Sequence, residues 1–382
     1  MAKSNRREKI LIIGNGFDLA HGLPTAYKDF MRFCKVVPKI LLDKESMSIS
    51  DAIENADIHS KIKAVIESEL NDDAGILENK TISMLQELNV CIQENIWYTY
   101  FEKIKGKIQG DNWIDFESEI SEVIEYLDRK IDRLEKKYKR SDFINDRDPR
   151  GKITSFFVTI FPDQLLNLSG REIRERCFND LETLTRALEI YLSSFVEKID
   201  CDELNIISEI QPDYVLSFNY TDTYERIYGI KEKKSEIFYI HGKCNAGNPM
   251  KENNMVLGID EYLEGKDKDI HTNFSIFKKF VQRIRKKTGA GIYTILDAIK
   301  YLHRTFSYES TVYVFGHSLD KTDKDILSQL LGHKTTAVKV YCKDKGSEGE
   351  LIAKMIQLIG QDNLVDKVYA NPSKLEFEVI EK

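Results

Sequence analysis

Short apolar runs rich in β-branched residues lie near both ends of this chain and are rare in its middle. Continuous runs of this kind are typical of strands that are buried on both faces of a parallel sheet. The runs interpreted as strands are Lys9–Ile13, Tyr214–Phe218, Ile237–Ile240, Met255–Leu257, Thr311–Phe315, Ala337–Cys342 and Leu375–Ile380. The sequence therefore predicts one parallel sheet whose first strand is far from the others along the chain.

The stretch between the first two runs has the pattern of helices. Apolar residues recur every three or four positions over Trp113–Arg140 and Ile173–Ile199, which is the period of an amphipathic helix. We therefore expect an α/β fold with a Rossmann-like parallel sheet and a large helical insertion after the first strand. The expected domains are a sheet domain of residues 1–30 and 206–382 and a helical insertion domain of residues 31–205.

Composition limits the classes of function. A formal net charge of −7 argues weakly against a general nucleic-acid binder. No apolar run approaches the ~20 residues that span a bilayer, so no membrane association is expected. The 6 cysteines are scattered without a Cys-x-x-Cys pair, which disfavours a zinc module or a disulfide framework and favours a reducing cytoplasm. We expect a cytoplasmic protein.

Four segments with glycine or polar residues follow strand-like runs. In open α/β sheets, ligands bind at the loops beyond the carboxyl ends of the strands. The segments are Gly14-Asn15-Gly16 with Gly22-Leu23-Pro24, Ser217–Thr221, His241-Gly242 and Gly316–Leu319. Their positions predict one nucleotide site at one edge of the sheet.

Each segment also has a purely structural interpretation. Gly14-Asn15-Gly16 can offer N–H groups to a diphosphate, but it lacks the third glycine of the dinucleotide fingerprint, so a dehydrogenase is disfavoured. Asn219 can bind a ribose hydroxyl or a water molecule, or it can cap a helix opening at Tyr220–Thr223. His241 can act as a general base or bond a backbone carbonyl.

The last segment, Gly316–Leu319, precedes a helix predicted over Asp323–Leu331. The strand, turn and helix resemble a serine-hydrolase nucleophile elbow, but Asp320 occupies the place of the final glycine of that motif. A contact from the backbone and Ser318 to a phosphate at the helix N-terminus is the better interpretation.

Two charged stretches have ordinary structural explanations. Lys278–Lys287 alternates basic and apolar residues and predicts a solvent-facing amphipathic helix rather than a nucleic-acid patch. Asp320, Asp323 and Asp325 suit the start of a helix, where carboxylates complement the helix dipole. No metal is expected.

Taken in order, the four segments resemble those of the sirtuin-like NAD-binding fold. Sirtuins open with Gly-Ala-Gly and then Gly-Ile-Pro, and Gly14 and Gly22 have that same separation. Their Thr-Gln-Asn-x-Asp corresponds to Ser217–Thr221, their catalytic His-Gly to His241-Gly242, and their Gly-Thr-Ser-Leu to Gly316–Leu319. The four-cysteine zinc module and the Asp-Phe-Arg after Gly-Ile-Pro are absent, so protein deacylation is disfavoured.

A narrower resemblance is to the AbiH family of bacterial phage abortive-infection proteins. It rests on the segments Gly14–Leu19, Gly22–Thr25, Trp113–Glu117, Phe218–Thr221 and Phe315–Leu319. The two resemblances imply an antiviral effector that cleaves NAD at the nicotinamide–ribose bond, through an oxocarbenium-like state. They imply that Asn219 orients the ribose or the attacking water and that His241 is the general base.

The resemblance also implies which residues surround the nucleotide. These are Gly14, Asn15, Gly16, Phe17, Asp18, Gly22, Gly316, His317 and Ser318. NAD, or a related nucleotide such as ADP-ribose, would be the ligand, with a phage-encoded trigger and a second copy of the chain as further partners. Two alternatives stay open: a nucleotide-binding sensor or interaction protein without catalysis, and an RNA-directed toxin.

Overall fold

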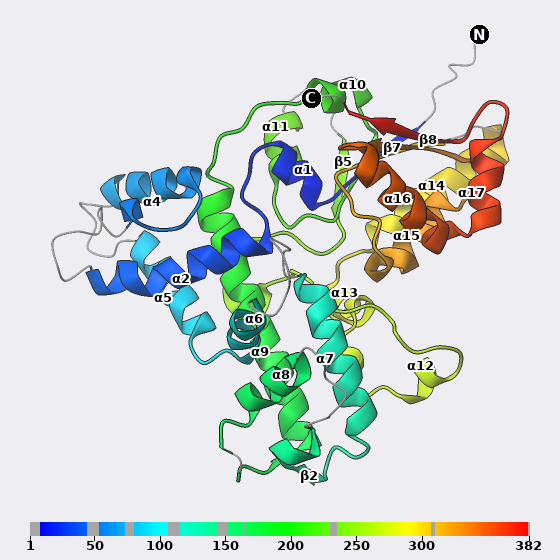
Figure 1. The fold of residues 1–382 in the computed structure, drawn as a ribbon. Helices are drawn as coiled ribbons and strands as arrows, with labels where there is room; N and C mark the ends of the chain where they lie inside the picture. Colours follow the sequence, from blue (N-terminus) through cyan, green and yellow to red (C-terminus); the bar gives the residue numbers. More distant parts are fainter. Residues whose placement is uncertain are drawn as a thin grey trace. The chain divides into compact units, whose positions relative to one another are not determined.

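The structure is a computed structural model that describes residues 8–43, 53–72, 80–105, 115–143, 151–163, 165–229, 235–306 and 310–380. The chain forms two compact units (Figure 1). Unit 1 comprises Met1–Thr25, Asp200–Cys244 and Lys286–Lys382, and unit 2 comprises Ala26–Ile199 and Asn245–Arg285. The segment Asn245–Arg285, which the sequence analysis places in the sheet domain, thus lies in unit 2.

Unit 1 is built on a six-stranded parallel sheet. Its strands are β1 (Lys9–Ile13), β4 (Tyr214–Ser217), β5 (Glu236–Tyr239), β6 (Ser310–Phe315), β7 (Thr336–Cys342) and β8 (Leu375–Val379). They are ordered β5-β4-β1-β6-β7-β8, and every neighbouring pair is parallel. This is the doubly wound order, in which ligands bind where the strand order reverses. That point lies between β1 and β6, and the predicted α/β fold with a Rossmann-like parallel sheet is confirmed.

Helices cover both faces of this sheet (Figure 1). They are α1 (Asn15–Ala20), α10 (Asn205–Ile210), α11 (Thr223–Tyr228), α14 (Gly291–Phe306), η6 (Lys321–Asp323), α15 (Lys324–Leu331), α16 (Lys345–Ile359) and α17 (Gln361–Val368). Side chains alternate along a strand, so Ile10 and Ile12 of β1 pack into a core with α14, α15 and α16. Leu11 and Ile13 pack on the other face with α10, α11 and Phe17 of α1. Burial on both faces explains the continuous apolar run.

Unit 2 is mainly helical. Its elements are α2 (Tyr27–Asp43), α4 (Ser60–Asp72), α5 (Lys80–Ile92), α6 (Ile96–Ile104), α7 (Phe116–Lys130), β2 (Lys137–Tyr138), η2 (Arg140–Asp142), α8 (Lys152–Ile160), β3 (Leu168–Ser169), α9 (Gly170–Tyr191), η3 (Leu192–Val196), η4 (Met250–Glu252), α12 (Asp267–Ile270), η5 (Ser275–Phe277) and α13 (Lys279–Lys286). Trp97, Tyr100 and Phe116 are fully buried in its aromatic core. In the part of the chain that the structure describes, no helix combines the length and apolarity needed to cross a bilayer.

The strand predicted over Met255–Leu257 is wrong. These residues are buried but adopt an extended loop in unit 2. The carbonyl of Leu257 accepts a hydrogen bond from Gln282 Nε2 at 2.9 Å. A side chain thus provides the hydrogen bond that a neighbouring strand would provide in a sheet. A short apolar run signals burial, and burial alone does not require a sheet.

The helix predicted over Trp113–Arg140 is too long. Helix α7 ends at Lys130, and Lys137 then pairs with Ser169 in the antiparallel β2–β3 ladder. The backbone N–H of Gly170 donates to Lys136 O at 3.1 Å, which ties this segment to the start of α9. Trp113 and Ile114 of the family motif lie outside the described residues.

The basic helix is confirmed as α13, but its predicted orientation is wrong. Lys278 and Lys279 are 1% and 2% exposed, whereas Phe280 and Ile284 are 41% and 73% exposed. Lys278 Nζ lies 2.7 Å from a carboxylate oxygen of Glu261, and Lys279 pairs in the same way inside unit 2. Ion pairing explains why charged side chains occupy the inner face of an amphipathic helix.

Candidate functional site

Two glycine-containing loops meet at the carboxyl edge of the sheet, where the strand order reverses. Gly14 N donates to Phe315 O at 3.4 Å, and Gly16 N donates to Gly316 O at 2.7 Å. A Cβ on Gly16 would lie 2.8 Å from Gly316 Cα. Gly316 has φ +66°, and a Cβ there would lie 2.1 Å from Phe17 N. Glycine is therefore required for the two loops to touch.

These contacts bear on the predicted diphosphate cradle. The N–H groups of Gly14 and Gly16 are bonded within the protein, and Phe17 N donates to Gly14 O at 2.8 Å. The Phe17 ring belongs to the core below the loop. Ser318 is exposed beside these glycines, and Asn15 is half-buried. Polar side chains therefore remain at this edge for a phosphate, and their binding role stays a prediction.

The predicted residues Asn15 and Gly22 shape helix α1. Asn15 Oδ1 accepts a hydrogen bond from Thr25 Oγ1 at 2.6 Å, which links the first residue of α1 to the segment that follows it. Gly22 has φ +70°, and its N–H donates to Leu19 O at 3.0 Å. This left-handed turn ends the helix, a position that favours glycine.

Asn219 and His241 follow adjacent parallel strands. Ser217 of β4 pairs with Tyr239 of β5, and Asn219 and His241 each come two residues after these partners. Both are buried, with exposures of 6% and 4%. Helix α11 begins only at Thr223 and Asn219 does not cap it. The sheet therefore holds an amide and an imidazole at one level of the same edge.

Asp323 lies between two buried imidazoles. Its Oδ1 is 2.9 Å from His241 Nε2, and its Oδ2 is 3.8 Å from His317 Nε2. The distance of 2.9 Å lets the carboxylate pair with the His241 ring when the ring carries a proton on both nitrogens. Leu319 N donates to His317 Nδ1 at 2.9 Å, which places the proton of a neutral His317 on Nε2, toward the carboxylate. The Phe218 ring packs edge-on against both imidazoles.

We call His241, His317 and Asp323 the histidine–aspartate group. One carboxylate beside two imidazoles gives the site an anion that can stabilise a proton on either ring. Within the described ranges, no set of three or more His, Cys, Asp or Glu side chains is arranged to hold a metal ion.

Asp18 is a second buried carboxyl at this edge. Thr221 Oγ1 donates to Asp18 Oδ2 at 2.6 Å, and Thr223 Oγ1 donates to Thr221 Oγ1 at 3.0 Å. Burial raises the pKa of Asp18 to about 6, although these hydroxyls, the Asn219 side chain and the Arg226 charge act to lower it. The Asn219 side chain is thus a further hydrogen-bond partner of the Asp18 carboxyl.

His21 is a buried histidine with a structural explanation. Its Nδ1 lies 2.7 Å from Phe17 O, and its Nε2 lies 2.8 Å from Tyr228 Oη. Leu204 N donates to the same Tyr228 hydroxyl at 2.8 Å, so that hydroxyl donates to His21 Nε2 and Nδ1–H donates to Phe17. Burial lowers the pKa of His21, which favours this neutral form.

Sequence reasoning missed the roles of Asp323 and Thr221. Asp323 was interpreted only as a complement to a helix dipole, yet its carboxylate faces His241 and His317. The available signal was its place just after the fourth segment, at the same strand end as His317. Thr221 occupies the place of the final Asp of the sirtuin Thr-Gln-Asn-x-Asp motif, and its hydroxyl donates to the carboxyl of Asp18.

Comparison with known proteins gives one match. The family model described as "Bacteriophage abortive infection AbiH" matches residues 10–342, a range that holds the carboxyl ends of β1, β4, β5 and β6 and the helices of unit 2. Comparison with curated proteins and with solved structures gives no significant match.

Proposed function

The chain belongs to the bacteriophage abortive infection AbiH family, and on this premise we propose that it acts in phage defence by cleaving NAD at the bond between nicotinamide and ribose. Loss of NAD would stop the metabolism of an infected cell before the phage completes its growth. The family membership covers both units of the chain and supports the defence role. The chemistry rests on the residues at the sheet edge.

One observation carries the chemical proposal. Asn219 and His241 are both buried, two residues beyond paired residues of the adjacent strands β4 and β5, and a carboxylate lies 2.9 Å from the His241 imidazole. A positioned imidazole beside a carboxylate is a general base whose protonated form the carboxylate stabilises. An amide can orient a water molecule or a sugar hydroxyl beside it.

The reaction balances with water as the only co-reactant. The bond between nicotinamide nitrogen and the ribose carbon breaks, and nicotinamide leaves with the bonding electron pair. Water adds to the resulting oxocarbenium-like carbon, and His241 takes the proton that the water loses. Asp323 stabilises the imidazolium that forms, because opposite charges at this separation in a buried site attract strongly. ADP-ribose and nicotinamide are the products.

The residues at the sheet edge suit the ribose of a nucleotide better than its diphosphate. On the ribose side, the Asp18 carboxyl and the Asn219 amide are buried polar neighbours that a sugar hydroxyl could also contact. On the diphosphate side, the N–H groups of Gly14 and Gly16 already donate to carbonyls. The ribose side is therefore the stronger support for this ligand.

The RNA-directed alternative has less support. Its basic helix would have to present cations to a phosphate backbone, but Lys278 and Lys279 of that segment are buried in ion pairs with Glu261 and Glu117. A nucleotide sensor without catalysis would use the same strand ends, and it differs from the proposal only in leaving NAD intact.

The test is to incubate the purified protein with NAD and to measure nicotinamide and ADP-ribose by chromatography, with and without phage lysate. We expect stoichiometric release of both products. His241→Ala should lower the rate ~100- to 10,000-fold, the usual loss when a general base is removed. Asn219→Ala should have a loss of similar size.

The matched control is His271→Ala, because His271 is an exposed histidine of unit 2. Its rate should equal that of the parent. Thermal stabilisation by NAD without nicotinamide release, under every condition, would favour the sensor and end the catalytic proposal. An unchanged rate in His241→Ala would remove His241 from the mechanism.

A further inference from the structure

A buried cluster of charges in unit 2 has no part in the proposed reaction. Arg186 and Glu189 of α9 are 2% and 1% exposed, and their side chains pair at 2.7 Å. Arg186 also donates two hydrogen bonds to the carboxylate of Glu87 in α5, at 2.7 and 3.2 Å. Burying charges is costly, and apolar side chains of similar volume often join helices as well or better. The cluster therefore calls for an explanation other than helix packing.

The cluster holds the backbone of two residues elsewhere in unit 2. Glu189 Oε1 accepts a hydrogen bond from Asn245 N at 3.1 Å. Arg186 Nη2 donates to Ala246 O at 3.1 Å, and Ala246 N donates to Ser193 Oγ at 3.2 Å. Ser193 belongs to η3, a π-helical segment of the kind that is frequent at functional sites. A buried polar network of this kind rigidifies the backbone that it binds.

The backbone held in this way continues directly from the loop that carries His241. The chain passes from unit 1 to unit 2 between Cys244 and Asn245. In unit 1, Cys244 N donates to Tyr220 O at 2.8 Å, in the loop after β4. Two consecutive residues are thus held by hydrogen bonds, one in each unit. A shift of Asn245 must displace Cys244, because a trans peptide bond fixes the distance between their Cα atoms.

We infer that Arg186 and Glu189 are positioning residues for His241, because they fix the chain that leaves its loop. This inference rests on the proposed function, which makes His241 the general base. A general base must lie within hydrogen-bond reach of the proton that it takes. A displacement of about 1 Å, caused far from the reacting atoms, can cost ~100-fold in rate.

The experiment replaces Glu189 by glutamine in the full-length protein. The carboxylate accepts hydrogen bonds on both oxygens, whereas one end of the glutamine amide only donates. In one orientation this NH₂ group would face the N–H of Asn245. In the other it would face the donors of Arg186 and Asn253. Glu189→Gln therefore weakens the cluster in either orientation while keeping the volume of the side chain.

The first measurement is amide hydrogen exchange, resolved by residue. Gly242 N and Cys244 N donate to carbonyls of unit 1. If the cluster positions the loop, both amides should exchange about 2- to 10-fold faster in Glu189→Gln, the factor for one lost hydrogen bond. Faster exchange confined to residues 245–246 would overturn the inference, because the cluster would then act only within unit 2.

The second measurement is the kinetics of nicotinamide release. Glu189→Gln should lower kcat about 10- to 100-fold and leave the KM for NAD within about 2-fold, because the change affects orientation rather than ligand binding. A parental kcat in the folded variant would overturn the inference. If the parent leaves NAD intact, the proposed function fails, and the exchange pattern alone decides whether the cluster positions the His241 loop.

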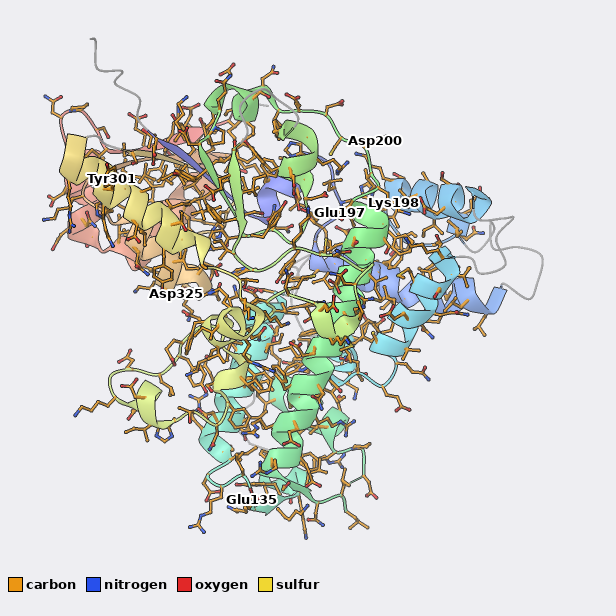
Figure 2. The ribbon with its side chains drawn as sticks, turned by 180° about the vertical axis from the view of Figure 1, so that it is seen from behind. Glu135, Glu197, Lys198, Asp200, Tyr301 and Asp325 are labelled. Carbon is orange, nitrogen blue, oxygen red and sulfur yellow. The ribbon has the colours of Figure 1, made fainter. Side chains whose placement is uncertain are left out.

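The matched control is Glu135→Gln. The Glu135 side chain is 75% exposed, and it lies at the opposite end of unit 2 from Glu197, which follows η3 (Figure 2). This variant should match the parent in both measurements. Thermal unfolding shows whether Glu189→Gln folds. If it does not, Ser193→Ala replaces it, with the same expected changes, because this variant removes only the acceptor of Ala246 N.

Discussion

At the scale of single residues, the site depends on two carboxyl groups in different surroundings. Asp323 faces two imidazoles, and its carboxylate can pair with either ring when that ring is protonated. Asp18 faces two threonines and an amide, and burial raises its pKa. Different environments for paired acids are the usual means by which one site separates proton transfer from substrate binding.

The first prediction concerns Asp323. Asp323→Asn keeps the shape of the side chain but removes the charge beside His241, so the rate of nicotinamide release should fall about 100-fold or more. Asp320→Asn is the matched control, because Asp320 caps η6 through Thr322 N and asparagine caps equally well. Equal rates in the two variants would show that the Asp323 carboxylate does not assist His241.

The second prediction concerns stability and pH. The folded pKa of Asp18 is about 6, above its ordinary value of 3.8, so the folded state loses stability as the pH rises from 3.8 to about 6, and the loss stays constant above that pH. This loss of stability becomes smaller as the pH falls below 6, and it disappears below pH 3.8, the pKa of Asp18 in the unfolded chain. Asp18→Asn should therefore stabilise the protein by roughly 3 kcal/mol at pH 8, at about 1.4 kcal/mol for each pKa unit, and much less at pH 4.5. Chemical denaturation at both pH values measures the difference, and a pH-independent gain would contradict it.

At the scale of elements, the close contact of the loops after β1 and β6 sets the geometry of the edge. Each loop supplies a glycine where the other loop's backbone approaches, and hydrogen bonds join the two. A Cβ on Gly14 would lie only 2.8 Å from His317 Cα. The close contact between the two loops therefore also positions His317 of the histidine–aspartate group.

The third prediction tests this contact. Gly316→Ala places a Cβ 2.1 Å from Phe17 N in a residue with φ +66° and should cost about 2 kcal/mol or more, with a matching loss of activity. Gly349→Ala in α16 meets nothing within 4 Å and should gain about 0.5–1 kcal/mol. Thermal unfolding compares them, and a tolerated Gly316→Ala would contradict the required contact.

The fourth prediction concerns the inner face of α13. Lys279→Ala should destabilise unit 2 by about 3–5 kcal/mol, because it leaves the largely buried carboxylate of Glu117 without its 2.8 Å partner. Lys251→Ala, which removes an exposed lysine of the same unit, should change stability by less than about 0.5 kcal/mol. Similar denaturation midpoints for the two variants would argue that the ion pair adds nothing.

At the scale of the whole molecule, the sequence predicted the sheet better than its surroundings. Strands β1, β4, β5, β6, β7 and β8 match the apolar runs to within a residue at each end, because burial on both faces leaves an unbroken pattern. The same pattern over Met255–Leu257 reflects burial in unit 2. The spacing of apolar residues predicted the helix α13. It did not predict that the lysines at its start are buried, because their carboxylate partners lie elsewhere in the chain.

The sequence predicted where the candidate site residues lie in the sheet, but not which of their side chains contact one another. Strand ends located Asn219, His241 and Gly316, since a parallel sheet gathers its carboxyl ends at one edge. The contact between Asp323 and His241 joins residues that no local pattern connects. The bond from Thr221 to Asp18 arises from the β1–β4 register, which only the folded chain defines.

The fifth prediction concerns where a ligand acts. ADP-ribose should slow amide hydrogen exchange in segments 14–23, 217–224, 240–244 and 316–323 of unit 1, since these follow the strand ends. Exchange within α9 of unit 2 serves as the internal reference. Slowing confined to unit 2, or none at saturating ADP-ribose, would place the ligand elsewhere.

The central position of β1 has a consequence for synthesis of the protein. Ile10 pairs with Tyr214 on one side and with Val312 on the other, so β1 is synthesised long before either of its partner strands. At ~5–20 residues per second, the roughly 200 residues before β4 take on the order of 10–40 s. A nascent chain that ends before Asp323 lacks the carboxylate that lies 2.9 Å from His241 in the complete histidine–aspartate group.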